Sequence, residues 1–418
     1  MAGSGRGTEF PLTAGQRQHF EVMRRNPALR MAIWDCFRIP GELDIDTFTD
    51  SVEILVSRHE ALRVEVLKLP DGEPAQRIRS LPPRNDLITC QNVIARSEEQ
   101  FSRYIRHVMV QEQRRAWDEA AYPFRFRLFR YSPTVHALIT GFSHMAVDGI
   151  GAELLIRDLM RTYADAVADR APRGLPRRSF TDSVVRRPST DGGSVRSAER
   201  DPSGPLTRFD VPAPDPGERG LRSRQSSLSL TGTRLAALRE QADLHGCSEF
   251  TWILAAFART VLGFTSQDRI TIAVPVNLRA PAEREVVGMY VMEVPVAVER
   301  PRDAGTGRDF VAAVGSAVLR ATVRHRRSAA WDQGHPADLF VNYRRRSGAP
   351  GREPPALGTT GYLPRIDYQI SGIGLRIFSR PDVLDVQVVF ESSVFSVDSA
   401  GNIFETLIRN LITASGRR

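Results

Sequence analysis

The chain has 418 residues, 41% of them hydrophobic and 25% charged, which is the composition of an ordinary globular protein. That length is enough to bury two sizeable cores. No apolar run approaches the roughly 18 residues that span a bilayer, and the start Met-Ala-Gly-Ser-Gly-Arg has no apolar signal core.

Cysteine use and charge exclude further classes. Cys36, Cys90 and Cys247 are few and widely spaced, which predicts a reducing cytoplasm with neither a disulfide framework nor a zinc site. The net charge is +8, but Lys68 is the only lysine among the 57 basic residues. This skew is typical of codon bias in a GC-rich genome, and the arginines are dispersed over solvated faces. We therefore expect a cytoplasmic protein that binds neither nucleic acid nor membrane.

Residues 1–170 alternate between helical and strand patterns. Apolar spacing predicts a helix around 48–56, and the alternation from Leu62 to Val66 predicts a half-buried strand. Residues 93–120 are polar and helix-prone, and strands are expected between 124 and 142. A helix is then predicted from Gly149 to Tyr163, where apolar residues fall on one face.

The composition changes sharply after the first 170 residues. Residues 171–222 are rich in Pro, Gly, Ser and Arg and have little to bury, which predicts a flexible connection between lobes. The C-terminal lobe would then cover 223–418. Within it, the patterns predict helices over 249–264 and 398–414 and strands over 270–276 and 384–390. Both lobes therefore have mixed α/β character.

His144 and the pair Asp148-Gly149 form the pattern that points most clearly to chemistry. They follow the apolar, strand-like run 135–142 and precede the helix predicted from Gly149, so rigid elements hold His144 on both sides. Asp148 lies where a helix N-terminus favours a carboxylate, and Gly149 lets the backbone approach a ligand closely. A lone histidine after an apolar strand is more often structural. The pattern alone therefore leaves a positioned base and a structural histidine both open.

Further segments, in chain order, carry a family resemblance. Pro11-Leu-Thr-Ala-Gly-Gln16, Ser57-Arg-His-Glu-Ala-Leu-Arg63 and His144 to Gly149 resemble the first three motifs of the condensation-domain family of nonribosomal peptide synthesis. Phe180-Thr-Asp-Ser183 resembles the fourth motif weakly, and Val287 to Pro295 is a degraded form of the fifth. This family belongs to the chloramphenicol-acetyltransferase-like acyltransferases. The resemblance implies an α/β fold in which two such lobes form a V-shaped pseudo-dimer with a tunnel between them.

The chain departs from the family at one position in the motif. Many members carry two adjacent histidines, and here Ser143 replaces the first. The resemblance assigns chemistry to the second histidine, which is His144. The Glu-Gly-His signature of the epimerisation relatives is missing, and the cyclising relatives carry Asp in place of the active histidine. Both of those branches are therefore disfavoured.

The resemblance also implies roles for the site residues. His144 would accept a proton from the attacking amine or hydroxyl, or orient that group. Asp148 would fix the loop through a buried ion pair with Arg279, since a guanidinium binds a carboxylate bidentately. Gly149 would offer its backbone N–H to the developing oxyanion. Ser143 is expected to be a structural or pocket residue, because Gly-x-Ser-x-Gly is absent. The remaining histidines show no metal-ligand spacing, so no metal site is expected.

These features predict a free-standing condensation enzyme, an acyltransferase that forms an amide or ester in natural-product biosynthesis, including that of antibiotics. The donor would be an acyl group on the phosphopantetheine arm of a carrier protein, which acts in trans because no carrier or adenylation segment fits in the chain. The acceptor would be a small-molecule amine or alcohol, and no permanently bound cofactor is expected.

Two alternatives stay open. One is a coenzyme-A-dependent acyltransferase, and the other is a catalytically silent, condensation-like docking domain. The intact His144 and Asp148 argue against a catalytically silent domain, whereas Ser143 and the degraded motif at 288–295 favour one.

Overall fold

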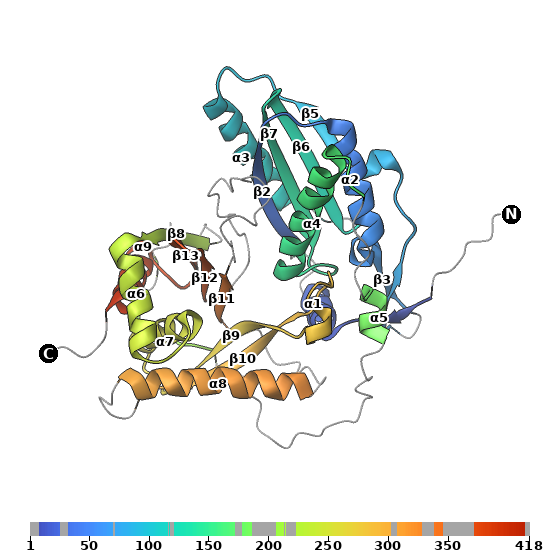
Figure 1. The fold of residues 1–418 in the computed structure, drawn as a ribbon. Helices are drawn as coiled ribbons and strands as arrows, with labels where there is room; N and C mark the ends of the chain where they lie inside the picture. The colour runs from blue at the N-terminus through green and yellow to red at the C-terminus, as the bar shows by residue number, and fades with distance from the viewer. Residues whose placement is uncertain are drawn as a thin grey trace. The chain divides into compact units, whose positions relative to one another are not determined.

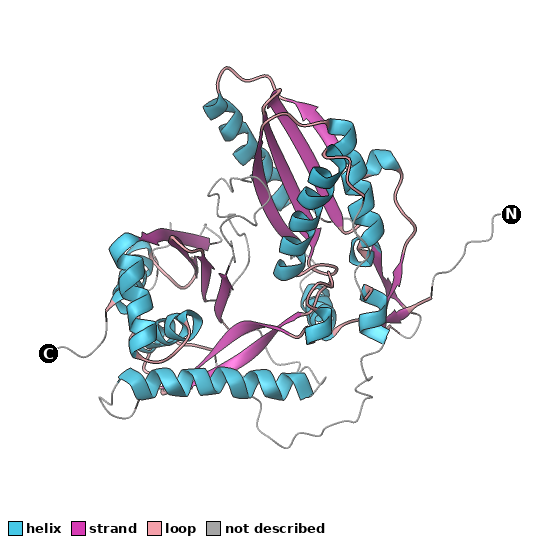
Figure 2. Ribbon diagram, viewed as in Figure 1, coloured by secondary structure: helices cyan, strands magenta, loops and turns pink. Residues whose placement is uncertain are grey.

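The computed structural model describes residues 8–25, 32–69, 72–115, 117, 121–171, 178–185, 206–212, 214, 223–301, 307–327, 338–345 and 372–413. These residues divide into two compact units, and both combine helices with β-sheet (Figures 1 and 2). The first unit contains the described residues up to Val185 together with Asn277–Met292, and the second contains the others. The lobe boundaries at 170 and 223 stay a prediction, and most of 171–222 lies outside the described residues.

The first unit is built on a four-stranded sheet. Its strand order is β2 (Ala32–Pro40), β7 (Val135–Ser143), β6 (Phe124–Ser132) and β5 (Thr89–Asn92). β7 runs antiparallel to both β2 and β6, and all its residues except Ser143 are buried. The apolar run before His144 is therefore a central strand, as predicted, because two-sided burial requires an almost continuous apolar sequence.

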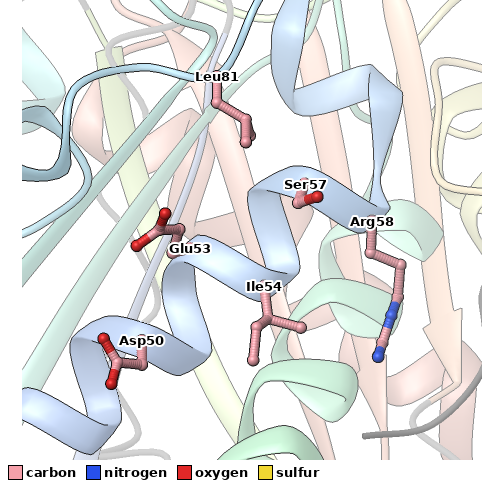
Figure 3. Close-up of a pocket in the computed structure, with 6 residues that line it drawn as sticks. All are labelled: Asp50, Glu53, Ile54, Ser57, Arg58 and Leu81. Atoms are coloured by element: carbon pink, nitrogen blue, oxygen red, sulfur yellow. The ribbon is translucent and has the colours of Figure 1, made fainter.

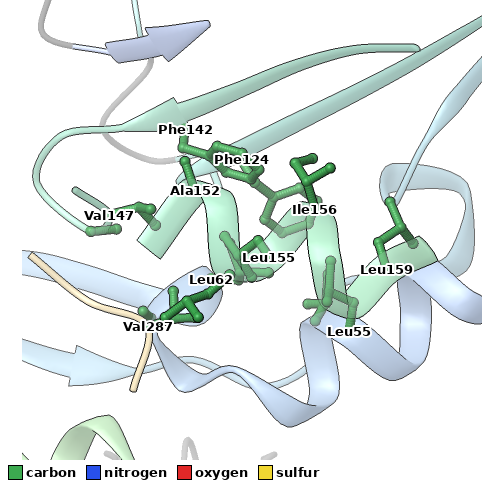
Figure 4. Close-up of a cluster of buried hydrophobic side chains, with 14 of the residues drawn as sticks. Leu55, Leu62, Phe124, Phe142, Val147, Ala152, Leu155, Ile156, Leu159 and Val287 are labelled. Carbon is green, nitrogen blue, oxygen red and sulfur yellow. The ribbon is translucent and has the colours of Figure 1, made fainter. Parts of the chain in front are cut away.

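Helices cover both faces of this sheet. α2 (Ile45–Arg58) and α4 (Gly149–Val167) pack together over one face, and α3 (Glu98–Arg114) covers the other. Figure 4 shows this core, in which Leu155 and Leu159 of α4 lie near Leu55 of α2, and Ala152 of α4 lies near Phe142 of β7. The core thus encloses the two elements that flank His144, and the helix predicted from Gly149 is confirmed.

A smaller sheet and two helices complete the first unit. The sheet has the order β1 (Phe10–Pro11), β4 (Pro74–Ile78) and β3 (Val64–Lys68). The strand predicted from Leu62 was wrong at its start, because Glu60–Arg63 forms a 3₁₀ turn and β3 begins at Val64. α1 (Ala14–Arg25) follows β1.

A short helix, α5 (Phe180–Val185), lies within the segment predicted to have little to bury. The structure differs there, because Phe180 is buried and packs edge-on against Phe10 and Tyr290. These few apolar residues are enough to dock one helical turn on the first unit.

The second unit is built on a six-stranded sheet. Its order is β10 (Val291–Glu299), β9 (Arg269–Asn277), β11 (Leu339–Arg345), β12 (Ile373–Ser379), β13 (Val383–Glu391) and β8 (Ser223–Thr231). The helices are α6 (Gly232–Leu244), α7 (Glu249–Leu262), α8 (Gly307–Arg327) and α9 (Val397–Ile412). α7 is buried almost all round, and its Trp252 donates from Nε1 to the Leu411 carbonyl at 2.9 Å. The elements predicted near 249–264, 270–276, 384–390 and 398–414 are confirmed.

One ionisable side chain of this six-stranded sheet, the partly exposed Glu293, has a raised pKa. Glu293 lies in β10 between the buried Met292 and Val294. Burial raises the pKa of Glu293 to about 7, although the positive charge of Arg376 acts in the opposite direction. The carboxyl group therefore gives up its proton near neutral pH rather than near 4.5.

We expect this group to make folding stability depend on pH. The folded pKa is raised, so its stabilising contribution is complete below about 4.5 and is lost as the pH rises through about 7. Glu293→Gln should remove that loss, which denaturant unfolding at a series of pH values would measure. Glu299→Gln, at the exposed end of the same strand, is the matched control. Parallel pH profiles for the wild type and Glu293→Gln would contradict this assignment.

Candidate active site

His144 lies in the turn that joins β7 to α4, and Ser143 shapes this turn. The Ser143 carbonyl accepts hydrogen bonds from the backbone N–H groups of Ala146 and Val147, both at 3.0 Å. Its side-chain Oγ accepts from the Met145 N–H at 3.3 Å. Ser143 thus satisfies the backbone of the turn with its own oxygens, which is the local turn geometry that serine hydroxyls favour.

The start of α1 fixes the same turn from the other side. Thr13 and Gln16 form a capping box, in which the Thr13 Oγ1 accepts from the Gln16 N–H at 3.1 Å and the Gln16 Oε1 accepts from the Thr13 N–H at 2.8 Å. The Gln16 Nε2 then donates to the Met145 carbonyl at 2.7 Å and to Gln76 Oε1 at 2.7 Å. Gln16 is completely buried, so these bonds tie α1 firmly to the residue after His144.

Asp148 caps α4 and forms a buried ion pair. Its carboxylate accepts at 2.7 Å from the Gly151 N–H, the third amide of the helix, and at 2.9 Å from the Tyr290 N–H. The Arg279 guanidinium binds the two oxygens bidentately, at 2.6 and 3.0 Å. Both side chains are only 1% exposed.

Arg279 uses all five of the N–H donors that a guanidinium carries. Besides the two bonds to Asp148, Nη2 donates to the Gly288 carbonyl at 3.1 Å and Nε donates to the Val286 carbonyl at 3.1 Å. Nη1 also donates to Asn277 Oδ1 at 3.4 Å. The guanidinium lies over the Tyr290 ring, 4.6 Å from its centroid. Because every donor is used, the cost of burying this cation is offset.

The segment Asn277–Met292, which carries Arg279, packs onto the first unit. Val286, Val287 and Tyr290 join its hydrophobic core. Thr13 Oγ1 donates to the Met289 carbonyl at 2.6 Å, and the Asp148 N–H donates to the Gly288 carbonyl at 3.1 Å. The ion pair is thus one of several contacts that hold this segment against the turn of His144.

Gly288 is required by close packing at this point. A Cβ atom there would lie 2.6 Å from the Phe180 ring and 2.5 Å from the Tyr290 ring. Two aromatic rings therefore occupy the space that any other residue would need.

Gly149 is the first residue of α4. The first amides of a helix have no acceptor within the helix, and the helix dipole favours negative charge near them. Its backbone N–H is therefore of the kind that can stabilise an oxyanion.

A second histidine lies beside His144, and the sequence patterns had not singled it out. The imidazole centroids of His19, in α1, and His144 are 5.2 Å apart, with the rings tilted by 39°. Burial lowers the pKa of His19 to about 4, against the opposing effects of its bond to Gly15 and of the Asp148 charge. His144 itself is partly exposed.

Other titratable groups of the first unit serve the fold. His59 Nε2 lies 3.0 Å from Asp158 Oδ2, which links the end of α2 to α4. Burial acts to raise the pKa of Asp158, but the bond and charge of His59, followed by Arg157 and Arg58, lower it overall. Among the described residues, no group of three or more His, Cys, Asp or Glu side chains could hold a metal ion.

A shallow hollow lies along the outer side of α2 (Figure 3). Its acidic groups, Asp50 and Glu53, are paired with Arg84 at 2.5 and 3.1 Å. The hollow contains none of the predicted site residues.

The described fold and the motif around His144 define an α/β protein of the condensation type. A family model described as "Condensation domain" matches residues 8–328, and the chain belongs to this family.

Solved structures share the fold. The X-domain from teicoplanin biosynthesis superposes with a TM-score of 0.74 at 20% sequence identity, covering 98% of this chain and 95% of that one. A structure described as "condensation domain-mediated chain release from the enacyloxin polyketide synthase" gives a TM-score of 0.75 at 16% identity, covering 100% of this chain and 85% of that one. The predicted α/β condensation fold is thereby confirmed, whereas the V shape and the tunnel stay a prediction.

Curated relatives are multidomain synthetases. The polyketide synthase-nonribosomal peptide synthetase ACE1 of Pyricularia oryzae is 27% identical over 301 residues, covering 69% of this chain and 7% of that protein. Tyrocidine synthase 2 of Brevibacillus parabrevis is 25% identical over 327 residues, covering 76% of this chain and 8% of that protein. The chain therefore spans less than a tenth of the length of these relatives. In the part of the chain that the structure describes, no helix is both long and apolar enough to cross a bilayer.

The ion pair at the site should show strong energetic coupling. Removing one partner leaves a buried charge without its counter-ion, so Asp148→Ala or Arg279→Ala alone should cost about 3–5 kcal/mol of stability. The double variant should cost much less than the sum of the two. A double-mutant cycle from denaturant unfolding measures this difference. The exposed pair Arg38–Glu98 is the control, where coupling of about 0–1 kcal/mol is expected. Independent, additive effects of the Asp148 and Arg279 variants would reject the coupling.

Gly288→Ala should destabilise the first unit through overpacking. The added methyl group meets the Phe180 and Tyr290 rings at 2.6 and 2.5 Å, so the rings must shift. The expected cost is about 1–3 kcal/mol, measurable by denaturant unfolding. Gly401→Ala in α9 is the control, because a Cβ there has open space. Equal unfolding midpoints for Gly288→Ala and the wild type would contradict the predicted overpacking, because the two rings would then accommodate the methyl group without a loss of stability.

Proposed function

We propose that this chain catalyses condensation, forming an amide or an ester from an acyl thioester carried by a carrier protein and an amine or hydroxyl acceptor. Its place would be in natural-product biosynthesis. His144 is the catalytic residue of this proposal. Membership of the condensation-domain family supports the reaction class, and the relationship to a nonribosomal peptide synthetase supports a carrier-bound donor.

The observation that carries the proposal is the construction around His144. Two buried side chains fix the turn after it, Gln16 at Met145 and Asp148 at the start of α4, and Arg279 in turn fixes Asp148. The His144 side chain itself stays partly exposed. A purely structural histidine would not need an independently braced turn, whereas a catalytic group must be held in one geometry.

The chemistry requires only proton movement and charge stabilisation. The acceptor nitrogen or oxygen attacks the thioester carbonyl carbon and gives its proton to a neutral His144, or is oriented by it. The carbonyl oxygen becomes an oxyanion, to which the Gly149 N–H is the proposed donor. When the carbonyl re-forms, the carbon–sulfur bond breaks, and the departing thiolate takes up the proton. No serine or cysteine nucleophile is needed, because the donor is already activated.

His144→Ala should abolish or strongly reduce product formation, because loss of general-base help costs about 10²–10⁴-fold in rate. The assay is intact-protein mass spectrometry of acyl-loaded carriers, which reports loss of the acyl group, together with detection of the condensed product. The fold should survive, because the turn is held by Ser143 and Gln16 rather than by the His144 ring. His107→Ala, at an exposed position in α3, is the control and should turn over normally.

Three other results would change the assignment. Full turnover by a folded His144→Ala variant would remove His144 from the chemistry. Turnover with acyl-coenzyme A but not with acyl carriers would favour the coenzyme-A-dependent alternative. Tight carrier or enzyme binding without turnover by the wild type would favour a docking domain, a role suggested by the solved complex of the teicoplanin X-domain with OxyB.

A further inference from the structure

His19 contacts the candidate catalytic residue directly. It lies in α1, is 6% exposed, and its ring centroid is 5.2 Å from that of His144. An imidazole pair at this separation is within the range of aromatic ring packing. The position of the His19 ring therefore bears directly on how the His144 ring can turn.

The orientation of the His19 ring is fixed by its own helix. Its Nδ1 lies 3.0 Å from the Gly15 carbonyl oxygen, one helical turn earlier. A carbonyl can only accept, so Nδ1 must carry the proton, and in the neutral ring Nε2 is then without one. Gly15 itself is closely packed, because a Cβ there would lie 2.3 Å from the Val291 carbonyl oxygen. The ring is thus mounted on a part of α1 that has no room to move toward Val291.

His19 is also uncharged at neutral pH. Burial lowers its pKa to about 4, and the partial opposition from the Gly15 bond and the Asp148 charge does not restore it. The Asp148 charge is already paired with Arg279. A neutral ring can lie against His144 in either protonation state, whereas a cationic ring would disfavour the protonated form of His144 that proton transfer requires.

We propose that His19 is a positioning residue, which holds the His144 imidazole in a single orientation by packing its own ring against it. This inference rests on the proposed function of His144. His19 is not itself a base in the reaction, because a buried imidazole that stays neutral to about pH 4 is a poor proton acceptor at neutral pH.

Two substitutions separate the ring contact from other effects. His19→Ala removes the ring, so kcat should fall by about 10²-fold, the size of effect that a small misplacement of a reacting group can cause. The KM for the carrier should change little, because His19 is buried. His19→Phe keeps a flat ring of similar size in the same place and should restore most of kcat, although it lacks both nitrogens.

A spectroscopic measurement tests positioning without any need for turnover. The imidazole NMR signals of His144 are identified by their loss in His144→Gln. In the wild type and in His19→Phe, their chemical shifts should differ clearly from those of a freely rotating histidine ring. In His19→Ala, the chemical shifts should move toward the values of a freely rotating ring. His245→Ala is the matched control, because His245 has the same Nδ1 contact to a carbonyl one turn earlier, at 2.8 Å from Gln241, but packs on Trp252.

These experiments test the positioning role of His19 and the proposed condensation activity separately. Unchanged His144 signals in a folded His19→Ala variant would overturn the positioning role. Loss of kcat in His19→Phe as severe as in His19→Ala would also overturn it, since a nitrogen rather than the ring would then be needed. If the wild type shows no condensation at all, the proposed function fails, but the NMR comparison still decides whether His19 orders His144.

Discussion

The structure of the site depends on one buried ion pair, between Asp148 and Arg279. Burying two opposite charges is expensive, and their attraction repays the cost only when the remaining hydrogen-bonding capacity is also satisfied. In this site that hydrogen-bonding capacity is satisfied, because the carboxylate accepts from Gly151 and Tyr290 as well as from Arg279. These bonds begin at the start of α4 and end in a segment far along the chain. Together with the bonds of Thr13 to Met289 and of the Asp148 N–H to Gly288, the pair therefore fixes where that segment lies.

The hydrogen bonds of Asp148 also limit its part in the reaction. Each of its two oxygens already accepts two hydrogen bonds, Oδ1 from Gly151 and Arg279 and Oδ2 from Arg279 and Tyr290. The four donors thus occupy the acceptor sites of the carboxylate, so neither oxygen is left for a substrate group. In the proposed reaction Asp148 therefore contributes geometry, and His144 remains the residue proposed to move the proton.

The sequence could predict those features that repeat along the chain or follow a family motif. The apolar run 135–142 and the periodic helix after Gly149 were confirmed as β7 and α4, and the motif pattern led to the Asp148–Arg279 contact that the structure contains. The fit of Gly288 between aromatic rings could not be predicted. That contact, like the ring contact of His19, joins single positions far apart in the chain. It leaves no periodic trace, because it depends on tertiary packing rather than on local propensity.

His19 and His245 show why the local sequence pattern does not reveal the function of a histidine. In both, a helix holds Nδ1 near the carbonyl one turn earlier, at 3.0 and 2.8 Å, and thereby selects the same tautomer and ring orientation. What differs is the neighbour, since His245 packs on Trp252 whereas His19 packs on His144. In each case the helix holds the imidazole in one orientation. His19 can order a reacting group because the Gln16–Met145 hydrogen bond holds the turn of His144 against α1, whereas the neighbour of His245 belongs to the core.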